Sequence, residues 1–259
     1  MRAGDRLLIG LIAASLAGVV ADGATGGAVQ SWIQANLASY GGTAGEALGW
    51  LGLALSPFAL IPLAAALWGR IAGLPDGAAR LLTRAARAID KISVTIADLA
   101  RWFALGLVLV TVFVVVQRYV FGASSTKLQE SVIYMHAGLF LLSSGAALLS
   151  GAHVRVDILF TKLGERGRAW TDLLGTYLAL LPMCWLILQT SQSYVGGAWR
   201  ILERSRESDG LPLVFLLKTA IPVFAVLMIL QGLAMAARAA LVLSDRPAPP
   251  AGATTEHEL

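Results

Sequence analysis

The sequence contains few of the residues on which enzyme chemistry and metal binding depend. Its 259 residues include one cysteine, Cys184, and three histidines, at positions 136, 153 and 257. A single cysteine excludes a disulfide framework and a cysteine-based metal site within one chain. The sequence also lacks a nucleophile–base pair, a metal-ligand spacing and a phosphate-binding glycine loop. We therefore predict that the chain is not an enzyme and holds no cofactor.

Charge is also scarce, and apolar residues take its place. Charged residues make up 14% of the chain and hydrophobic residues 57%, whereas a soluble domain carries about 25% charge. The mean hydropathy is +0.71. The net charge of +4 is small and gathers near the ends of apolar runs, which favours a membrane protein over a nucleic-acid-binding one. The composition predicts an all-α integral membrane protein, a bundle of helices.

Four apolar runs predict the core spans of this bundle. A helix needs about 20 apolar residues to cross the hydrocarbon of a bilayer. Pro182 and Pro222 should bend the last two spans. We assign a membrane domain to residues 78–243 and place its spans at 102–121, 131–152, 170–199 and 211–242.

One face of the span at 131–152 carries small residues. Ser143, Ala147 and Gly151 recur every four residues, so we expect them to share one face of a helix. Small residues at this spacing allow a neighbouring helix to approach closely in lipid. This face is therefore a candidate interface with another subunit.

Residues 1–77 form an N-terminal hydrophobic extension of one or two further spans. The first apolar run, 7–20, follows two arginines and is short for a span. It is either a cleaved signal peptide or a retained first helix that is short or tilted, and the retained helix is favoured. A second run, 47–68, contains Pro57 and Pro62, which should kink it.

The segment before the first core span carries a basic stripe. Arg80, Arg84, Arg87 and Lys91 are spaced by 4, 3 and 4 residues, and bulky apolar residues occupy the positions between them. This pattern favours an amphipathic helix in the membrane interface, with its basic side at the lipid headgroups. The alternative is a solvated helix that is continuous with the next span.

The distribution of Lys and Arg predicts the orientation of the core spans. One side of the membrane would hold 11 of these residues and the other side 6, and the richer side faces the cytoplasm. The C-terminus then lies in the cytoplasm, where the polar, proline-rich tail 244–259 is expected to be disordered. The richer side holds Arg80, Arg84, Arg87, Lys91, Arg101, Arg155, Lys162, Arg166, Arg168, Arg238 and Arg246, and the poorer side Arg118, Lys127, Arg200, Arg204, Arg206 and Lys218.

Polar residues mark both ends of the span at 131–152. After it, His153, Arg155 and Asp157 alternate with valines, so in an extended segment all three would point to one side and form a docking patch. The alternative, favoured by the residues alone, is that His153 and Arg155 cap the helix at the headgroups. Before the span, the helix dipole favours the carboxylate of Glu130. His136, inside the span, is expected to bond a neighbouring helix.

A membrane anchor for a redox complex, holding heme or quinone, is the competing functional class. His136 and His153 are 17 residues apart on one predicted helix, about 25 Å along its axis, so they cannot ligate one heme iron. The spans also carry almost no charge at their centres, unlike the solute paths of channels and carriers. The chain is therefore interpreted as a scaffold or partner subunit.

Several motifs in a fixed order resemble one family. From about residue 89 to 242 the chain is similar to the small-permease subunit of tripartite ATP-independent periplasmic (TRAP) transporters, the DctQ-like family. Residues 1–77 have no counterpart in this resemblance. The motifs are the basic helix before the first span, Arg118-Tyr119-Val120-Phe121, Gln129-Glu130, Gly151-Ala152-His153-Val154-Arg155-Val156-Asp157, Gly210-Leu211-Pro212, Lys218, Ile221-Pro222 and Leu230-Gln231-Gly232-Leu233.

The resemblance implies a small, non-catalytic subunit in a bacterial inner membrane. Such a subunit would brace a large permease subunit during sodium-coupled uptake of organic acids or related solutes. Sodium is expected on the large subunit, and a periplasmic solute-binding protein would deliver the solute. Together with the small-residue face, the motifs give the candidate subunit-interface or coupling residues Arg118, Glu130, Ser143, Ala147, Gly151, His153, Arg155, Asp157 and Lys218.

Overall fold

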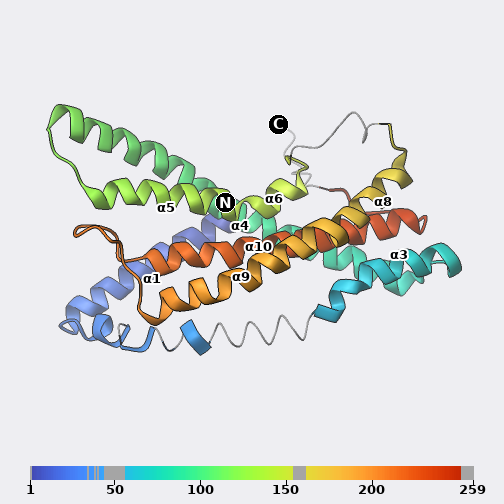
Figure 1. Ribbon diagram of the computed structural model, residues 1–259, viewed down its shortest axis with the longest axis horizontal. Helices are drawn as coiled ribbons and strands as arrows, with labels where there is room; N and C mark the ends of the chain where they lie inside the picture. Colours follow the sequence, from blue (N-terminus) through green and yellow to red (C-terminus); the bar gives the residue numbers. More distant parts are fainter. Residues whose placement is uncertain are drawn as a thin grey trace. The chain divides into compact units, whose positions relative to one another are not determined.

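The computed structural model describes residues 2–33, 35–37, 39, 41–43, 56–153 and 162–251. Within these ranges every regular element is a helix (Figure 1). The elements in chain order are α1 (Ala3–Ala24), η1 (Ser56–Leu60), α3 (Ile61–Ala72), α4 (Asp76–Val120), α5 (Thr126–Leu142), α6 (Ser144–Leu149), α8 (Glu165–Gly175), η2 (Thr176–Leu180), α9 (Leu181–Arg200) and α10 (Val214–Leu243).

Five of these helical stretches are long and apolar enough to cross a membrane. They are α1, α4, α5 together with α6, α8 through α9, and α10. Four of them match the predicted core spans, which overshoot the helices by at most three residues at one end, and α1 contains the first apolar run. The predicted all-α membrane bundle is therefore confirmed.

The chain divides into two compact units. Unit 1 comprises residues 1–52, 95–142 and 190–221, and unit 2 comprises 53–94, 143–189 and 222–259. Unit 1 thus contains α1, the second part of α4, α5 and the loop after α9, whereas unit 2 contains α3, the first part of α4, α6 and α8. The N-terminal extension is shared between the two units.

The predicted interfacial helix and the first core span form one helix. α4 runs without a break for 45 residues, because the segment from 78 to 105 contains neither Gly nor Pro. The basic segment and the first core span are therefore one helix, as in the alternative, and the position of the basic side at the lipid headgroups stays a prediction. The amphipathic pattern itself is present: Leu82 and Ala86 are buried in unit 2, whereas the basic stripe of Arg80, Arg84, Arg87 and Lys91 is exposed.

Gly151 ends the second core span. The helix ends at Leu149, and Gly151 has a left-handed φ of 68°. Glycine adopts this backbone conformation without the steric strain that a side chain would cause. The N–H of Gly151 donates to the Leu148 carbonyl and the N–H of Ala152 to the Ala147 carbonyl. This pair of bonds is a Schellman motif, which satisfies carbonyls at a helix C-terminus.

The predicted small-residue face is therefore wrong for Gly151, which is exposed and lies beyond the helix. Ser143 lies at the junction of α5 and α6, and the buried small residues are its neighbours Ser144 and Gly145. A Cβ at Gly145 would lie 3.0 Å from the Ser93 hydroxyl and 3.6 Å from the Leu227 carbonyl oxygen. Close helix packing exists in this region, but it is internal to unit 2.

Prolines shape the remaining helices. Pro182 has no N–H for the carbonyl of Leu178 and crowds it, and the helix widens there into the π-helical turn η2. Pro62 lies in the first turn of α3, where a missing N–H costs nothing. It therefore begins a helix instead of kinking one. The described part of that second apolar run, Ser56–Ala72, is shorter than a span, and residues 44–55 lie outside the described ranges.

The first part of the C-terminal tail packs on unit 2. The Arg246 guanidinium donates to the Leu74 carbonyl at 2.7 Å, and the Asp245 carboxylate accepts from Arg166 at 2.6 Å. Pro249 is buried, and its carbonyl accepts from the Arg238 guanidinium. The prediction of disorder from residue 244 onward is therefore wrong for residues 244–251.

Candidate functional site

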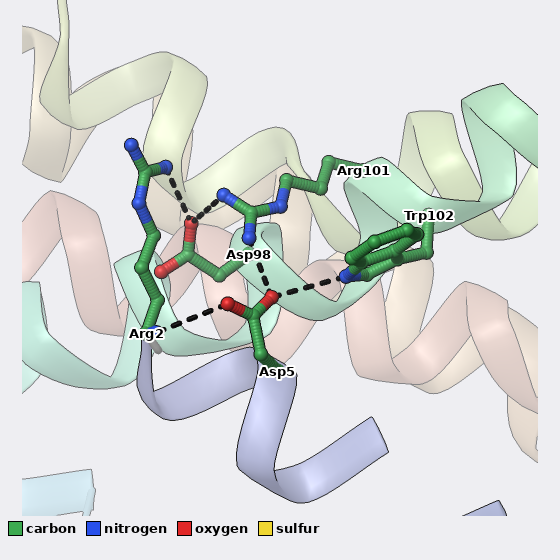
Figure 2. Close-up of polar contacts among 5 residues, drawn as sticks. All are labelled: Arg2, Asp5, Asp98, Arg101 and Trp102. Carbon is green, nitrogen blue, oxygen red and sulfur yellow. Dashed lines mark hydrogen bonds and ion pairs between the residues drawn. The ribbon is translucent and has the colours of Figure 1, made fainter. Parts of the chain in front are cut away.

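A cluster of charged side chains joins α1 to α4 in unit 1 (Figure 2). The Asp5 carboxylate accepts from Arg101 at 2.5 Å and from the Trp102 indole N–H at 3.1 Å. The Asp98 carboxylate accepts from Arg2 at 3.1 Å and from Arg101 at 3.2 Å. Arg101 therefore lies between two carboxylates that come from different helices.

Gly4 allows this approach. A Cβ at this position would lie 2.5 Å from the Asp98 Cβ and 2.6 Å from the Leu99 backbone nitrogen, so the first turn of α1 rests on the backbone of α4. Asp98 and Asp5 keep only 12% and 16% of their side-chain surface exposed. Hydrogen bonds to charged groups contribute about 1.5–3 kcal/mol when partly buried. These contacts attach the first turn of α1 to α4.

We predict that Gly4→Leu lowers the stability of the subunit. The larger side chain would overlap the α4 backbone, and overpacking of this kind costs about 1–3 kcal/mol. Thermal unfolding in detergent measures the loss. Arg6→Gln is the control, because Arg6 is exposed and its side chain makes no ion pair among the described residues. Equal unfolding midpoints for Gly4→Leu and the wild type would contradict the packing.

A second cluster in unit 1 ties the loop 201–213 to α5. The Glu130 carboxylate accepts a hydrogen bond from the Leu211 backbone N–H at 2.6 Å and a short one from the Ser205 hydroxyl. Gly210 lies so close that a Cβ there would be 2.9 Å from the Glu130 Oε1 and 2.2 Å from the Ser205 Oγ. The glycine is therefore required for the loop to reach the carboxylate.

Lys218 fastens the other side of this loop. Its ammonium donates to the Glu203 carboxylate at 2.5 Å and lies 3.9 Å from the centre of the Tyr194 ring. Only 14% of the lysine side chain is exposed. A cation over an aromatic face is stabilised by the ring quadrupole, and more strongly when water is excluded. Lys218 therefore holds α10, the loop and α9 together.

The structure thus brings together Glu130 and Lys218, two of the predicted coupling residues, at one loop. Both are used in contacts within the chain. Arg118 is exposed and forms no ion pair within the described part of the chain. His136 was predicted to bond a neighbouring helix, but its side chain is exposed on α5 and no hydrogen bond to it is found among the described residues. His153 is exposed just past the helix end, and Arg155 and Asp157 lie outside the described residues.

A buried polar network crosses unit 2. The Gln231 side chain is 1% exposed; its amide nitrogen donates to Asp90 at 3.1 Å, and its oxygen accepts from the Ser93 hydroxyl at 2.8 Å. Asp90 also forms an ion pair with Arg238. Asp90 and Ser93 were not among the candidate residues predicted from the sequence. The sequence does contain a hint of this network. Asp90 is an acidic residue within the basic stripe of α4, and Gln231 and Arg238 are polar residues seven apart in the last span, so they lie on one side of that helix.

Beside this network unit 2 has a cavity of about 400 Å³, lined by both leucines of α6 and by Arg168, Gln231 and Arg238. The lining is mixed, and Arg238 is already paired with Asp90. No group of His, Cys, Asp and Glu side chains among the described residues could hold a metal ion. The three polar clusters found in the described residues therefore connect elements of the chain to one another.

We predict that Glu130→Ala frees the loop 201–213. It removes a charge-assisted acceptor of two hydrogen bonds, a loss of about 1.5–3 kcal/mol. Trypsin should then cut faster at Arg204 and Arg206. Lys127→Ala is the matched control, because its pair with Asp209 is 55% and 63% exposed and exposed pairs contribute about 0–1 kcal/mol. Equal cleavage rates in the two variants would show that Glu130 does not hold the loop.

Comparison with known proteins identifies the family. A family model described as "Tripartite ATP-independent periplasmic transporters, DctQ component" matches residues 107–241. No curated protein and no solved structure matches the chain. The matched range contains Glu130, the loop 201–213, Lys218, Gln231 and Arg238, and it covers more than half of the chain. The chain therefore belongs to the family of the DctQ component, the small permease subunit of TRAP transporters.

Proposed function

We propose that this chain is the non-transporting membrane subunit that braces the large permease of a TRAP transporter. Components of the family work with a large permease and a periplasmic binding protein. One observation supports a bracing role in particular. Three charged residues near the ends of the spans, Glu130, Lys218 and Asp90, are engaged in contacts within the chain. Such contacts stiffen the subunit. In a carrier, by contrast, charged groups near the spans would be exposed to the solute.

The transported solute and the coupling ion are assigned to the partner in this proposal. We propose sodium-coupled uptake of organic acids or related solutes, with sodium held by the large subunit. A binding protein would deliver the solute from the periplasm. The family is one of transporter components in bacterial inner membranes. The competing proposal of a heme or quinone anchor gains no support from the family match.

The uptake experiment uses proteoliposomes that contain the large permease with or without this chain. With the binding protein outside and an inward sodium gradient, we expect uptake of a radiolabelled organic acid only when both membrane subunits are present. This chain alone should transport nothing. Uptake at the same rate by the large permease alone would contradict the proposed role. A solute specificity that changes with the small subunit would contradict the assignment of the solute to the partner.

The orientation proposed for the core spans follows from the excess of Lys and Arg on one side. Cysteine labelling in a Cys184→Ala background tests it. Ser208→Cys, in the loop between α9 and α10, should react with an impermeant maleimide added to the periplasmic side. Gly164→Cys, immediately before α8, should react only after the membrane is opened. The reverse pattern would place the C-terminus of the chain in the periplasm.

A further inference from the structure

The cavity of unit 2 adjoins an apolar groove. The cavity has a volume of about 400 Å³, and its lining includes Arg168, Gln231 and Arg238. The groove lies between α6, the α8–α9 stretch and α10, and it is lined by apolar side chains and one glycine. Leu148 of α6 and Met235 of α10 line both spaces. Together the two spaces are therefore polar at one end and apolar at the other.

The boundary of the hydrocarbon passes between the cavity and the groove. In the α8–α9 stretch the charges end at Asp172, and residues 173–199 carry none. In α10 the only charge after Lys218 is that of Arg238. Asp172 and Arg238 both line the cavity, whereas the groove lies along the uncharged part of each helix. An uncharged stretch of this length crosses the hydrocarbon, so the cavity lies at the level of the headgroups and the groove at the level of the acyl chains.

Two glycines shape the groove. A Cβ at Gly232 of α10 would lie 2.2 Å from the Leu180 Cδ2, so a side chain there would push Leu180 away from α10 and into the groove. A Cβ at Gly175 would meet no atom within 4 Å, and Met183 beside it is 60% exposed. The groove is thus open towards lipid. An acyl chain that enters it exchanges one apolar environment for another, so the headgroup must decide which lipid binds.

The cavity offers both signs of charge to a headgroup. Arg168 and Arg238 contribute positive charge, and Glu165 contributes negative charge. Arg238 donates to the Pro249 carbonyl from Nε and to Asp90 from one terminal nitrogen. A guanidinium has five N–H donors, so donors remain for a phosphate. Glu165 is exposed in the first turn of α8, and its carboxylate belongs to no ion pair found among the described residues.

We propose that unit 2 binds one phosphatidylethanolamine molecule here, with its headgroup in the cavity and one acyl chain in the groove. Arg168 and Arg238 bond the phosphate, and Glu165 accepts from the ammonium. A primary ammonium has three N–H donors, whereas the choline headgroup has none and a glycerol headgroup has no positive charge. The cavity volume is within the range of about 300–1,000 Å³ that ligand sites occupy. This lipid site goes beyond the bracing role and does not depend on it.

Native mass spectrometry of the full chain tests the choice of lipid. The protein is placed in nanodiscs of equal parts phosphatidylethanolamine, phosphatidylglycerol and phosphatidylcholine, and is then extracted into detergent. We expect one retained lipid per chain, with phosphatidylethanolamine preferred over each of the others about threefold, as one exposed charge contact allows. Equal retention of the three lipids, or retention of none, would overturn the proposal.

Two matched substitutions test the groove. Gly175→Phe places a ring in the groove, and Gly196→Phe places the same ring on α9 where it lines neither space. A Cβ meets no atom within 4 Å at either position, so both variants should unfold at the wild-type midpoint. We expect Gly175→Phe to lower lipid retention about tenfold, because the ring overlaps the acyl chain, and Gly196→Phe to leave it unchanged. Equal retention by the two variants would overturn the proposal.

Glu165→Gln tests the headgroup contact. The amide keeps the shape of the side chain but removes the charge that attracts the ammonium. We expect the preference for phosphatidylethanolamine over phosphatidylcholine to fall from about threefold to none, while one lipid per chain is still retained. Glu207→Gln, at an exposed carboxylate of unit 1, is the control and should keep the preference. An unchanged preference in Glu165→Gln would overturn the assignment of the ammonium to Glu165. None of these measurements involves the large permease, so their failure would leave the proposed function standing.

Discussion

The ion pair between Asp90 and Arg238 is the contact on which unit 2 depends. Both side chains are largely buried, at 16% and 10% exposed, so removal of either partner would leave a charge without compensation, at a cost of about 3–5 kcal/mol. Gln231 and Ser93 extend the pair into a network between α4 and α10. A polar network of this kind accepts only one register of the two helices, whereas the alanines that surround it in α10 would pack in several.

The same requirement, that polar groups away from water find partners, explains the rest of the chain. In unit 1 Glu130 and Lys218 hold the loop after α9, and Asp5 and Asp98 hold α1 against α4. Each cluster includes a position where only glycine fits, Gly210 in one case and Gly4 in the other. Close backbone approach and charge pairing therefore occur together, since the approach is what excludes water from the pair.

Apolar runs and end charges were sufficient to predict the spans, because length and hydropathy decide what crosses a bilayer. The same signals did not predict the continuity of α4, which depends on the absence of a helix breaker between the basic stripe and the span. Nor did they predict Gly151 as a helix end, since spacing alone does not distinguish a packing glycine from a capping one. Pairs such as Asp90 and Arg238, 148 residues apart, cannot be predicted from local patterns at all.

Hydropathy averages also conceal which side of a span faces lipid. The α8–α9 stretch and α4 both meet the length and hydropathy of a span, yet Gln189 and Gln192 on α9 are exposed where α4 exposes Val112 and Phe113. The amides are evident in the sequence, but the side of α9 on which they lie is known only from the buried residues Cys184, Ser191 and Ala198. The direction of these buried residues therefore shows which side of α9 the rest of the chain covers.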